Sequence, residues 1–300
     1  MAVEDARSDG SGTGVGGPGV LDVPHAAEAD AQLPPELATY AAYLLRRAHL
    51  RANRFAPAAD PNATGASGAR DYQVLDAIGE PGAAYSQQDL ADRLGINRTT
   101  MVKLIDRLET AGLVVRARNR QDRRSYVLAL TDGGRDAVTA LEPAMAAGDD
   151  RLTAALTPAE RDRFDVLLAA LVSREPCAGG PRRTGSLIAE CAYFVRRRFD
   201  GALSCAGLKA RHFDVLTALA GGPCSQQLLA RRLGLSEQGI LQIVDEVEAA
   251  GLVVRDRDPQ DRRRYALRTT PAGRHALAAA RRVVEAAEDE LAAILGADGR

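Results

Sequence analysis

Two stretches of this chain decide its fold, because each is a copy of the other. Residues 86–135 read SQQDLADRLGINRTTMVKLIDRLETAGLVVRARNRQDRRSYVLALTDGGR, and residues 225–274 read SQQLLARRLGLSEQGILQIVDEVEAAGLVVRDRDPQDRRRYALRTTPAGR. They align without a gap, 139 positions apart, and 26 of the 50 aligned residues are identical. A repeat of this length exceeds the roughly 20–50-residue units of solenoid proteins. The chain is therefore an internal duplication of a domain-sized unit, with a built-in pseudo-twofold relation.

Local signals predict the order of elements within each copy. In the first copy, Ser86 is a helix N-cap, and Gly95 and Gly112 end two successive helices. Residues 113–119 and 123–131 then predict two strands that flank a polar turn. Helix, helix, helix, strand, strand, helix is the order of a winged helix-turn-helix unit, an order that other small α+β units can share.

Longer helices are expected on both sides of this unit. An amphipathic helix is expected from Leu33 to Phe55, and a helix from Thr131 onward is expected to bend at Pro143. Thr157-Pro158-Ala159-Glu160 is a capping box that begins a further helix. The predicted fold class is mainly α with small β wings (α+β): two tandem winged helix-turn-helix domains joined through long helices as an intramolecular pseudo-dimer. The expected parts are a disordered tail at 1–32, a first domain at 33–173, a linker at 174–185 and a second domain at 186–300.

Composition excludes several classes of protein. The formal net charge is −1, so nucleic-acid binding has to come from local arginine clusters. No stretch approaches the ~18 apolar residues of a membrane span, and a signal peptide is not evident. We expect a soluble, cytoplasmic protein. The four cysteines show no C-x-x-C spacing and the four histidines are scattered, so neither a disulfide framework nor a metal site is expected.

The helix that follows position 97 carries the residues that we expect to contact DNA. Thr99, Lys103 and Arg107 share a polar, cationic face that suits the major groove. A lone row of charges is usually a solvated helix face. The arginines of the following strand–turn–strand favour DNA binding over a solvated helix face, because arginines on a projecting ribbon can contact DNA phosphates or enter a narrow minor groove. The expected DNA contacts of the first copy are Arg98, Thr99, Thr100, Lys103, Arg107, Arg116, Arg118, Arg120, Arg123 and Arg124.

Both copies resemble the MarR family of winged-helix transcriptional regulators. The first copy carries the resemblance in DRLETAGLVVR (106–116), DRR (122–124) and LTDGG (130–134). The second carries it in DEVEAAGLVVR (245–255), DPQDRR (258–263) and TPAG (270–273). The resemblance implies homodimers joined through their terminal helices, pseudo-palindromic operators, and release of DNA on binding small phenolic or other aromatic ligands or on cysteine oxidation.

The same resemblance implies roles for the wing residues. Asp122 and Arg124 would brace the first wing, and Arg120 and Arg123 would lie at or near its tip. Asp261 and Arg263 match the bracing pair in the second copy.

The second copy departs from the first on its recognition helix. Glu237, Gln242 and Glu246 stand where the first copy has Arg98, Lys103 and Arg107. A carboxylate facing phosphates is unfavourable, although Glu can accept a hydrogen bond from cytosine. We expect a weaker or differently specific head, with the first head dominant. Its expected contacts are Gln238, Gln242, Arg255, Arg257, Arg262, Arg263 and Arg264.

The two copies also differ at their ends. Residues 151–161 align with 290–300, so the helix that begins after Thr157 has no counterpart in the second copy. The helical interface of a pseudo-dimer would then be asymmetric. Two states stay open: a monomer that acts as a pseudo-dimer, and a homodimer formed through an exposed apolar face.

Regulatory residues are expected from the resemblance alone. The ligand pocket of such proteins lies between the interface helices and the winged head. Candidates by position are Tyr43, Arg46, His49, Tyr72, Tyr193, Arg196 and Phe213. Cys191 lies roughly where the peroxide-sensing branch places its reactive thiol, and Arg196–Arg198 are expected to lower its pKa. Ordinary core positions are the alternative for each of these residues.

The leading hypothesis is a DNA-binding transcriptional regulator with two heads in one chain, needing no cofactor. Its expected partners are double-stranded operator DNA and a small aromatic or phenolic effector, with no membrane. The alternative is a ligand- or protein-binding module that has kept the fold and lost DNA binding in one or both heads. An enzyme is disfavoured, because no phosphate loop, nucleophile elbow or paired-carboxylate arrangement is found.

Overall fold

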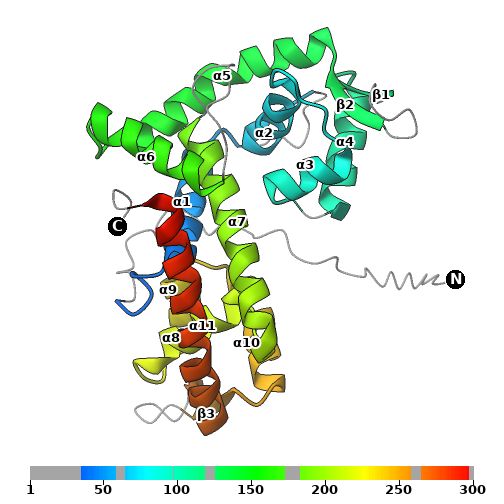
Figure 1. Ribbon diagram of the computed structural model, residues 1–300. Coiled ribbons are helices and arrows are strands. Elements are labelled where there is room, and N and C mark those ends of the chain that lie inside the picture. Colours follow the sequence, from blue (N-terminus) through cyan, green and yellow to red (C-terminus); the bar gives the residue numbers. More distant parts are fainter. Residues whose placement is uncertain are drawn as a thin grey trace, which may run out of the picture.

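The computed structural model describes residues 35–58, 65–96, 98–118, 126–172, 183–257 and 265–296. Two winged-helix heads flank a set of long helices (Figure 1). Head 1 consists of α2 (Gly68–Gly79), α3 (Gln87–Leu94), α4 (Arg98–Thr110), β1 (Val114–Arg118) and β2 (Tyr126–Leu130). Head 2 consists of α8 (Ala210–Ala220), α9 (Gln226–Leu233), α10 (Glu237–Ala249), β3 (Val253–Arg257) and β4 (Tyr265–Thr269). The tandem winged-helix fold is confirmed.

The helix-turn-helix of each head is fixed by the same local signals. The Ser86 hydroxyl accepts a hydrogen bond from the backbone N–H of Asp89. In return, the Asp89 carboxylate accepts a hydrogen bond from the backbone N–H of Ser86, the N-cap residue. Gly95 ends α3 with φ 69°, and Gly234 ends α9 with φ 64°. This left-handed conformation is easily adopted by glycine only. In head 2, Ser225 caps α9 by accepting from the backbone N–H of Leu228.

Each wing is a two-stranded antiparallel ribbon. Val114 pairs with Leu130 in head 1, and Val253 pairs with Thr269 in head 2. A third segment ties each ribbon to its head: Leu128 N–H donates to Tyr85 O, and Cys224 and Leu267 form an isolated bridge. The wing bases are therefore held on the heads while the ribbons project outward.

The long helices join the two copies. They are α1 (Ala41–Phe55), α5 (Asp132–Leu152), α6 (Pro158–Leu171), α7 (Thr184–Leu203) and α11 (Pro271–Leu295), with the short η2 (Ser204–Ala206) after α7. Helix α1 lies along α7, and α6 packs against α7 and α11. The described part of the second copy ends with α11 and contains no counterpart of α6. The helical interface is therefore asymmetric.

Three expectations about these helices need comment. The first helix begins at Ala41 and not at Leu33, because residues 35–39 form turns. Helix α5 runs without interruption through Pro143. The capping box at Thr157 is confirmed, with Pro158 as the first residue of α6. The expected tail (1–32) and most of the expected linker (174–182) lie outside the described residues.

Most of the buried apolar residues belong to two clusters, which extend over different parts of the molecule. One cluster runs continuously from α1, α6, α7 and α11 into head 2, from Leu37 and Tyr43 to Val253 and Leu267. The other is confined to head 1 and the start of α5. Head 2 thus shares its core with the long helices, whereas head 1 has a core of its own.

Candidate nucleic-acid interface

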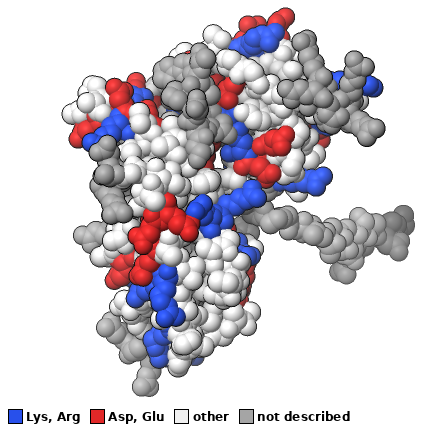
Figure 2. Space-filling model, viewed as in Figure 1, with Lys and Arg blue, Asp and Glu red and all other residues white. Residues whose placement is uncertain are grey.

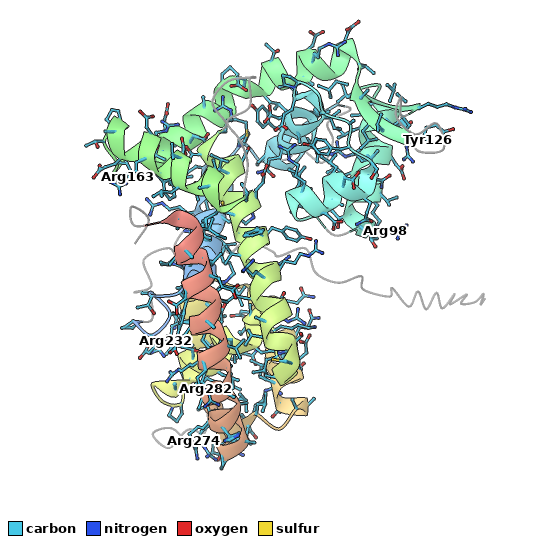
Figure 3. The ribbon with its side chains drawn as sticks, viewed as in Figure 1. Arg98, Tyr126, Arg163, Arg232, Arg274 and Arg282 are labelled. Atoms are coloured by element: carbon cyan, nitrogen blue, oxygen red, sulfur yellow. The ribbon has the colours of Figure 1, made fainter. Side chains whose placement is uncertain are left out.

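Helix α4 is the recognition helix of head 1, and it is strongly two-faced. Met101, Leu104, Ile105 and Leu108 are buried against α2 and α3. Arg98, Thr99 and Lys103 are exposed, and Thr100 is half-buried. Arg98 projects from head 1 on the side away from α6 (Figure 3). The cationic face expected from the sequence is therefore presented to solvent at the N-terminal half of this helix.

Arg107 has an internal partner that the sequence did not reveal. Its guanidinium forms an ion pair with Asp71 of α2 and donates to Gly65 O at 3.3 Å. Asp71 is buried, and it also accepts from the backbone N–H of Ser67 at 2.7 Å. Arg107 is thus primarily a link between α4 and α2, and its contact with DNA stays a prediction.

The arginine at the base of each wing is also engaged. Arg116 pairs with Asp106 at 2.7 Å and Glu109 at 3.1 Å, both on α4. Its counterpart Arg255 pairs with Asp245 at 2.5 Å and with Glu248, both on α10. The same clamp, which the sequence did not predict, therefore holds both wings on their recognition helices.

The outer wing residues are only partly within the described chain. Arg118 and Arg257 are exposed, and the Arg257 guanidinium lies 5.1 Å from the ring centre of Tyr265. The remaining expected wing contacts and the two bracing pairs lie outside the described residues: Arg120, Asp122, Arg123, Arg124, Asp261, Arg262, Arg263 and Arg264.

The recognition helix of head 2, α10, presents different chemistry. Glu237, Gln238 and Gln242 are exposed on it. Glu246 is a different case, because its carboxylate accepts from Arg211 at 2.6 and 2.7 Å and lies 2.7 Å from His212 Nε2. Burial alone would raise the pKa of Glu246, but the bonds to His212 and Arg211 lower it. The expectation that Glu246 confronts DNA phosphates therefore needs correction: Glu246 is held by Arg211 and His212 of α8.

The two heads place this ion pair with opposite polarity. Head 1 has Arg107 on its recognition helix and Asp71 on α2, whereas head 2 has Glu246 on its recognition helix and Arg211 on α8, with His212 beside it. Asp71 and His212 each directly precede the aromatic residue of a related segment, DYQVL or HFDVL. Comparing Arg107 with Glu246 and Asp71 with His212 at the same time would have revealed this exchange of residue types from the sequence.

In the view of Figure 1, α4 lies to the right of α7, α10 overlaps the lower end of α7, and α6 and α11 lie to the left of α7. Positive and negative side chains are interspersed on the described face in Figure 2. The electrostatic field of this face has no single sign, so any attraction of DNA has to come from the cations of the recognition helices and wings.

Comparisons with known proteins agree with this geometry. The MarR family model matches residues 65–125 and 206–264, one stretch in each copy. The "Putative transcriptional regulatory protein for hcr operon" of Thauera aromatica is 32% identical over 120 residues, covering 37% of this chain and 72% of the relative. This chain belongs to the MarR family.

Two further similarities each cover about a third of this chain or slightly more. The HTH-type transcriptional regulator YkoM of Bacillus subtilis (strain 168) is 32% identical over 98 residues, or 33% of this chain and 63% of that protein. The transcriptional repressor CouR bound to a 23-mer DNA duplex is 33% identical, with a TM-score of 0.37, over 39% of this chain and 84% of that one. Members of the MarR family are transcriptional regulators. No described helix of this member is long and apolar enough to cross a membrane.

The expected MarR-type ligand residues lie where each head meets the long helices. Tyr43, Tyr72 and Phe213 are buried. Tyr72 donates to Glu142 at 2.5 Å and accepts from Arg183 at 3.1 Å, and its pKa is raised first by burial and then by Glu142. His49 is half-buried beside Asn53, and burial, with Arg70 and Arg196, lowers its pKa to about 4. The other three candidates, Arg46, Tyr193 and Arg196, lie on α1 and α7.

Two hollows beside the long helices are lined by other residues than these seven candidates. The crevice between α2, α3 and α7 has a volume of about 10 Å³, room for about one water. A groove of about 660 Å³ runs between α7 and α11, but none of the seven candidates lines it.

The expected redox residue is in an unfavourable environment. Cys191 is fully buried, and its thiol donates to Leu168 O at 3.1 Å. Burial, with the adjacent Glu190 carboxylate, raises the pKa of Cys191 to about 12. The expectation that nearby arginines lower this pKa is wrong, because Arg197 and Arg198 pair instead with Asp92 and Glu290. Within the described ranges, no group of three or more metal-ligating side chains is found.

Proposed function

We propose that this member of the MarR family is a sequence-specific regulator whose two heads bind the two halves of one pseudo-palindromic operator. The observation that carries the proposal is the pair of exposed polar recognition surfaces, on α4 and α10, joined by one set of long helices. Two heads held in one chain suit half-sites about one helical turn, or ~10 base pairs, apart. Tethering also makes the second contact intramolecular, at roughly millimolar effective concentration.

Head 1 contributes the larger part of the affinity in this proposal. Arg98 and Lys103 are exposed on α4, whereas Glu237 and Gln242 occupy the same positions on α10. Cations release counterions from DNA and attract it without regard to sequence, while glutamine reads base edges. Head 2 is therefore proposed to add specificity with less attraction.

A small aromatic or phenolic effector is proposed to release the DNA. The aromatic candidates lie where a head of one copy meets the first helix of the other, so a ligand that separates these surfaces changes the distance between heads. Such a molecule would act as an inducer, and the protein as a repressor.

The test is DNA binding by fluorescence anisotropy across a salt series, on sequences selected from a random pool. The matched variants are Lys103→Gln, which gives head 1 the residue of head 2, and Gln242→Lys, which does the reverse. Lys103→Gln is expected to reduce the magnitude of the salt slope by about 0.9, and Gln242→Lys to increase it by about 0.9. Failure to select any sequence would refute the proposal, and a loss with Gln242→Ala equal to that with Lys103→Ala would refute the dominance of head 1.

A further inference from the structure

Each copy packs its first helix against the head of the other copy. Residues 40–47 of α1 and its N-cap read YAAYLLRR, and residues 190–197 of α7 read ECAYFVRR, so the two segments correspond. The α1 segment contacts α8 and α9 of head 2, while the α7 segment contacts α3 of head 1. The two contacts are equivalent in place and can be compared residue by residue.

The contact between α1 and head 2 is aromatic and buried. Tyr43 is 1% exposed, and its hydroxyl donates to Arg232 O at 2.8 Å. The ring of Tyr40 lies edge-on to Phe213, with ring centres 5.1 Å apart. Arg46 adds an ion pair of 3.1 Å with Asp214. Because both helices of this contact belong to one continuous apolar cluster, separating them would expose hydrophobic surface to water.

The equivalent contact between α7 and head 1 is ionic. Glu190 stands where α1 has Tyr40, and its carboxylate lies 3.7 Å from Arg93 Nη2. Arg197 pairs with Asp92 at 3.5 Å. Tyr193, the counterpart of Tyr43, is only half-buried. Its ring lies so close to Gly95 that a Cβ there would meet the ring at 2.4 Å.

Arg93 is the centre of this ionic contact. Its side chain is 4% exposed and bonds Glu80 of head 1 at 2.6 Å, as well as the hydroxyl of Tyr85. The Glu80 pair lies within head 1, so it does not resist a movement of head 1 as a body. Glu190 is the partner of Arg93 that lies on α7.

We propose that Glu190 is a positioning residue: through Arg93 it fixes head 1 against α7 and so sets the distance between the two recognition helices. Head 2 is fixed by a shared hydrophobic core, whereas head 1 is held on α7 and its N-cap by polar contacts, namely Arg93–Glu190, Arg197–Asp92 and Tyr72–Arg183. Polar interfaces between domains permit relative motion more readily than apolar ones. Head 1 is therefore the adjustable head, and head 2 moves with the long helices.

The distance between heads can be measured in the free protein. Val102 on α4 and Leu241 on α10 are exposed counterparts, so Val102→Cys and Leu241→Cys place one spin label on each recognition helix. Cys177 and Cys205 are replaced by Ser to leave no competing reactive site, while Cys191 and Cys224 are buried. Double electron–electron resonance then gives the distribution of distances between the labels, without DNA.

Two matched substitutions test the asymmetry, each turning a carboxylate of one contact into its amide. Glu190→Gln removes the Glu190–Arg93 ion pair, one of the two ion pairs described between α7 and head 1, while Arg93 keeps Glu80 and Arg197 keeps Asp92. Asp214→Asn removes the corresponding ion pair of head 2. We expect Glu190→Gln to broaden the distance distribution or add a second distance, and Asp214→Asn to leave it as narrow as in the parent.

An unchanged distribution for Glu190→Gln would overturn the proposal, and so would equal broadening by Asp214→Asn. Circular dichroism checks that each variant is folded. Should Glu190→Gln lose helix, Glu190→Asp keeps the charge with a shorter reach and is expected to broaden the distribution as well. The distance measurement does not require the proposed DNA function. A second readout that rests on that function is the spacing of half-sites selected from a random pool, which Glu190→Gln should widen.

Discussion

Charge reversal of two glutamates on α10 should have opposite outcomes, although the sequence presents them as alike. Glu237 and Glu246 stand where head 1 has Arg98 and Arg107, so each could be read as a carboxylate that repels DNA. The structure separates them: Glu237 is exposed in the first turn of the helix, and Glu246 is bound to Arg211 and His212. We therefore expect Glu237→Arg to strengthen DNA binding and Glu246→Arg to weaken head 2 itself.

The cost of Glu246→Arg follows from its contacts. The carboxylate makes two bonds to Arg211 and one to His212, with about a third of the Glu246 and Arg211 side chains exposed. Solvent screening limits such bonds to about 1 kcal/mol each or less, giving about 2 kcal/mol for the cluster. A guanidinium placed beside Arg211 adds repulsion of about 1 kcal/mol. The expected loss in the free energy of opening head 2 is about 3 kcal/mol.

Hydrogen exchange read by mass spectrometry measures this loss in each head separately. Amides of α8 and α10 should exchange about a hundredfold faster in Glu246→Arg, while those of α2 and α4 should keep their rates. Glu237→Arg loses a favourable charge at a helix N-terminus, a cost of about 0.5 kcal/mol. Its salt slope for DNA should steepen by about 0.9. The reasoning is refuted if Glu246→Arg leaves exchange unchanged and strengthens DNA binding as Glu237→Arg does.

Three further outcomes are expected. Iodoacetamide applied to the native protein, with the sites mapped by mass spectrometry, should alkylate exposed Cys205 and spare Cys191; similar rates at both thiols would restore the redox hypothesis. Because the pKa of His49 is about 4 in the folded chain and about 6.5 when unfolded, stability should fall by up to roughly 3 kcal/mol as pH drops from 6.5 to 4. His49→Gln should flatten that part of the pH profile of urea unfolding, and an unaltered profile would contradict the assignment. The exposed aliphatic side chains of Val102 and Leu241 suit contacts with thymine methyl groups, so replacing thymidine by deoxyuridine in the selected half-sites should weaken binding, measured by anisotropy, about fourfold per methyl group lost. In Val102→Ala, the half-site bound by head 1 should no longer respond to this replacement. Equal binding of the parent protein to both DNAs would exclude such contacts.

The sequence predicted best the features that local chemistry decides. In the structure Ser86 caps α3 and Gly95 ends it, as the sequence predicted. These signals act over four or five residues and do not depend on distant partners. The exposed face of α4 was predicted for the same reason, since helical periodicity alone places its apolar stripe inward.

The sequence failed where a side chain is held by a distant element. Arg107 is paired with Asp71, 36 positions away, and Arg93 meets Glu190, 97 positions away. A charge with such a partner cannot be told from a solvated one by its neighbours in the chain. The thiol of Cys191 shows the same limit, because its arginine neighbours in sequence point to other partners in space.

The pattern of divergence between the copies supports two different half-sites. None of the ten residues Ile96–Ile105 is identical to its counterpart, although the buried positions stay apolar. The following stretch retains the wing clamp in full: Asp106, Glu109 and Arg116 recur as Asp245, Glu248 and Arg255. In a homodimer every substitution on a recognition helix appears in both heads, so both must read the same bases. Fusion removes that coupling, and here the divergence lies in the helix that would read DNA, while the scaffold that presents it is kept.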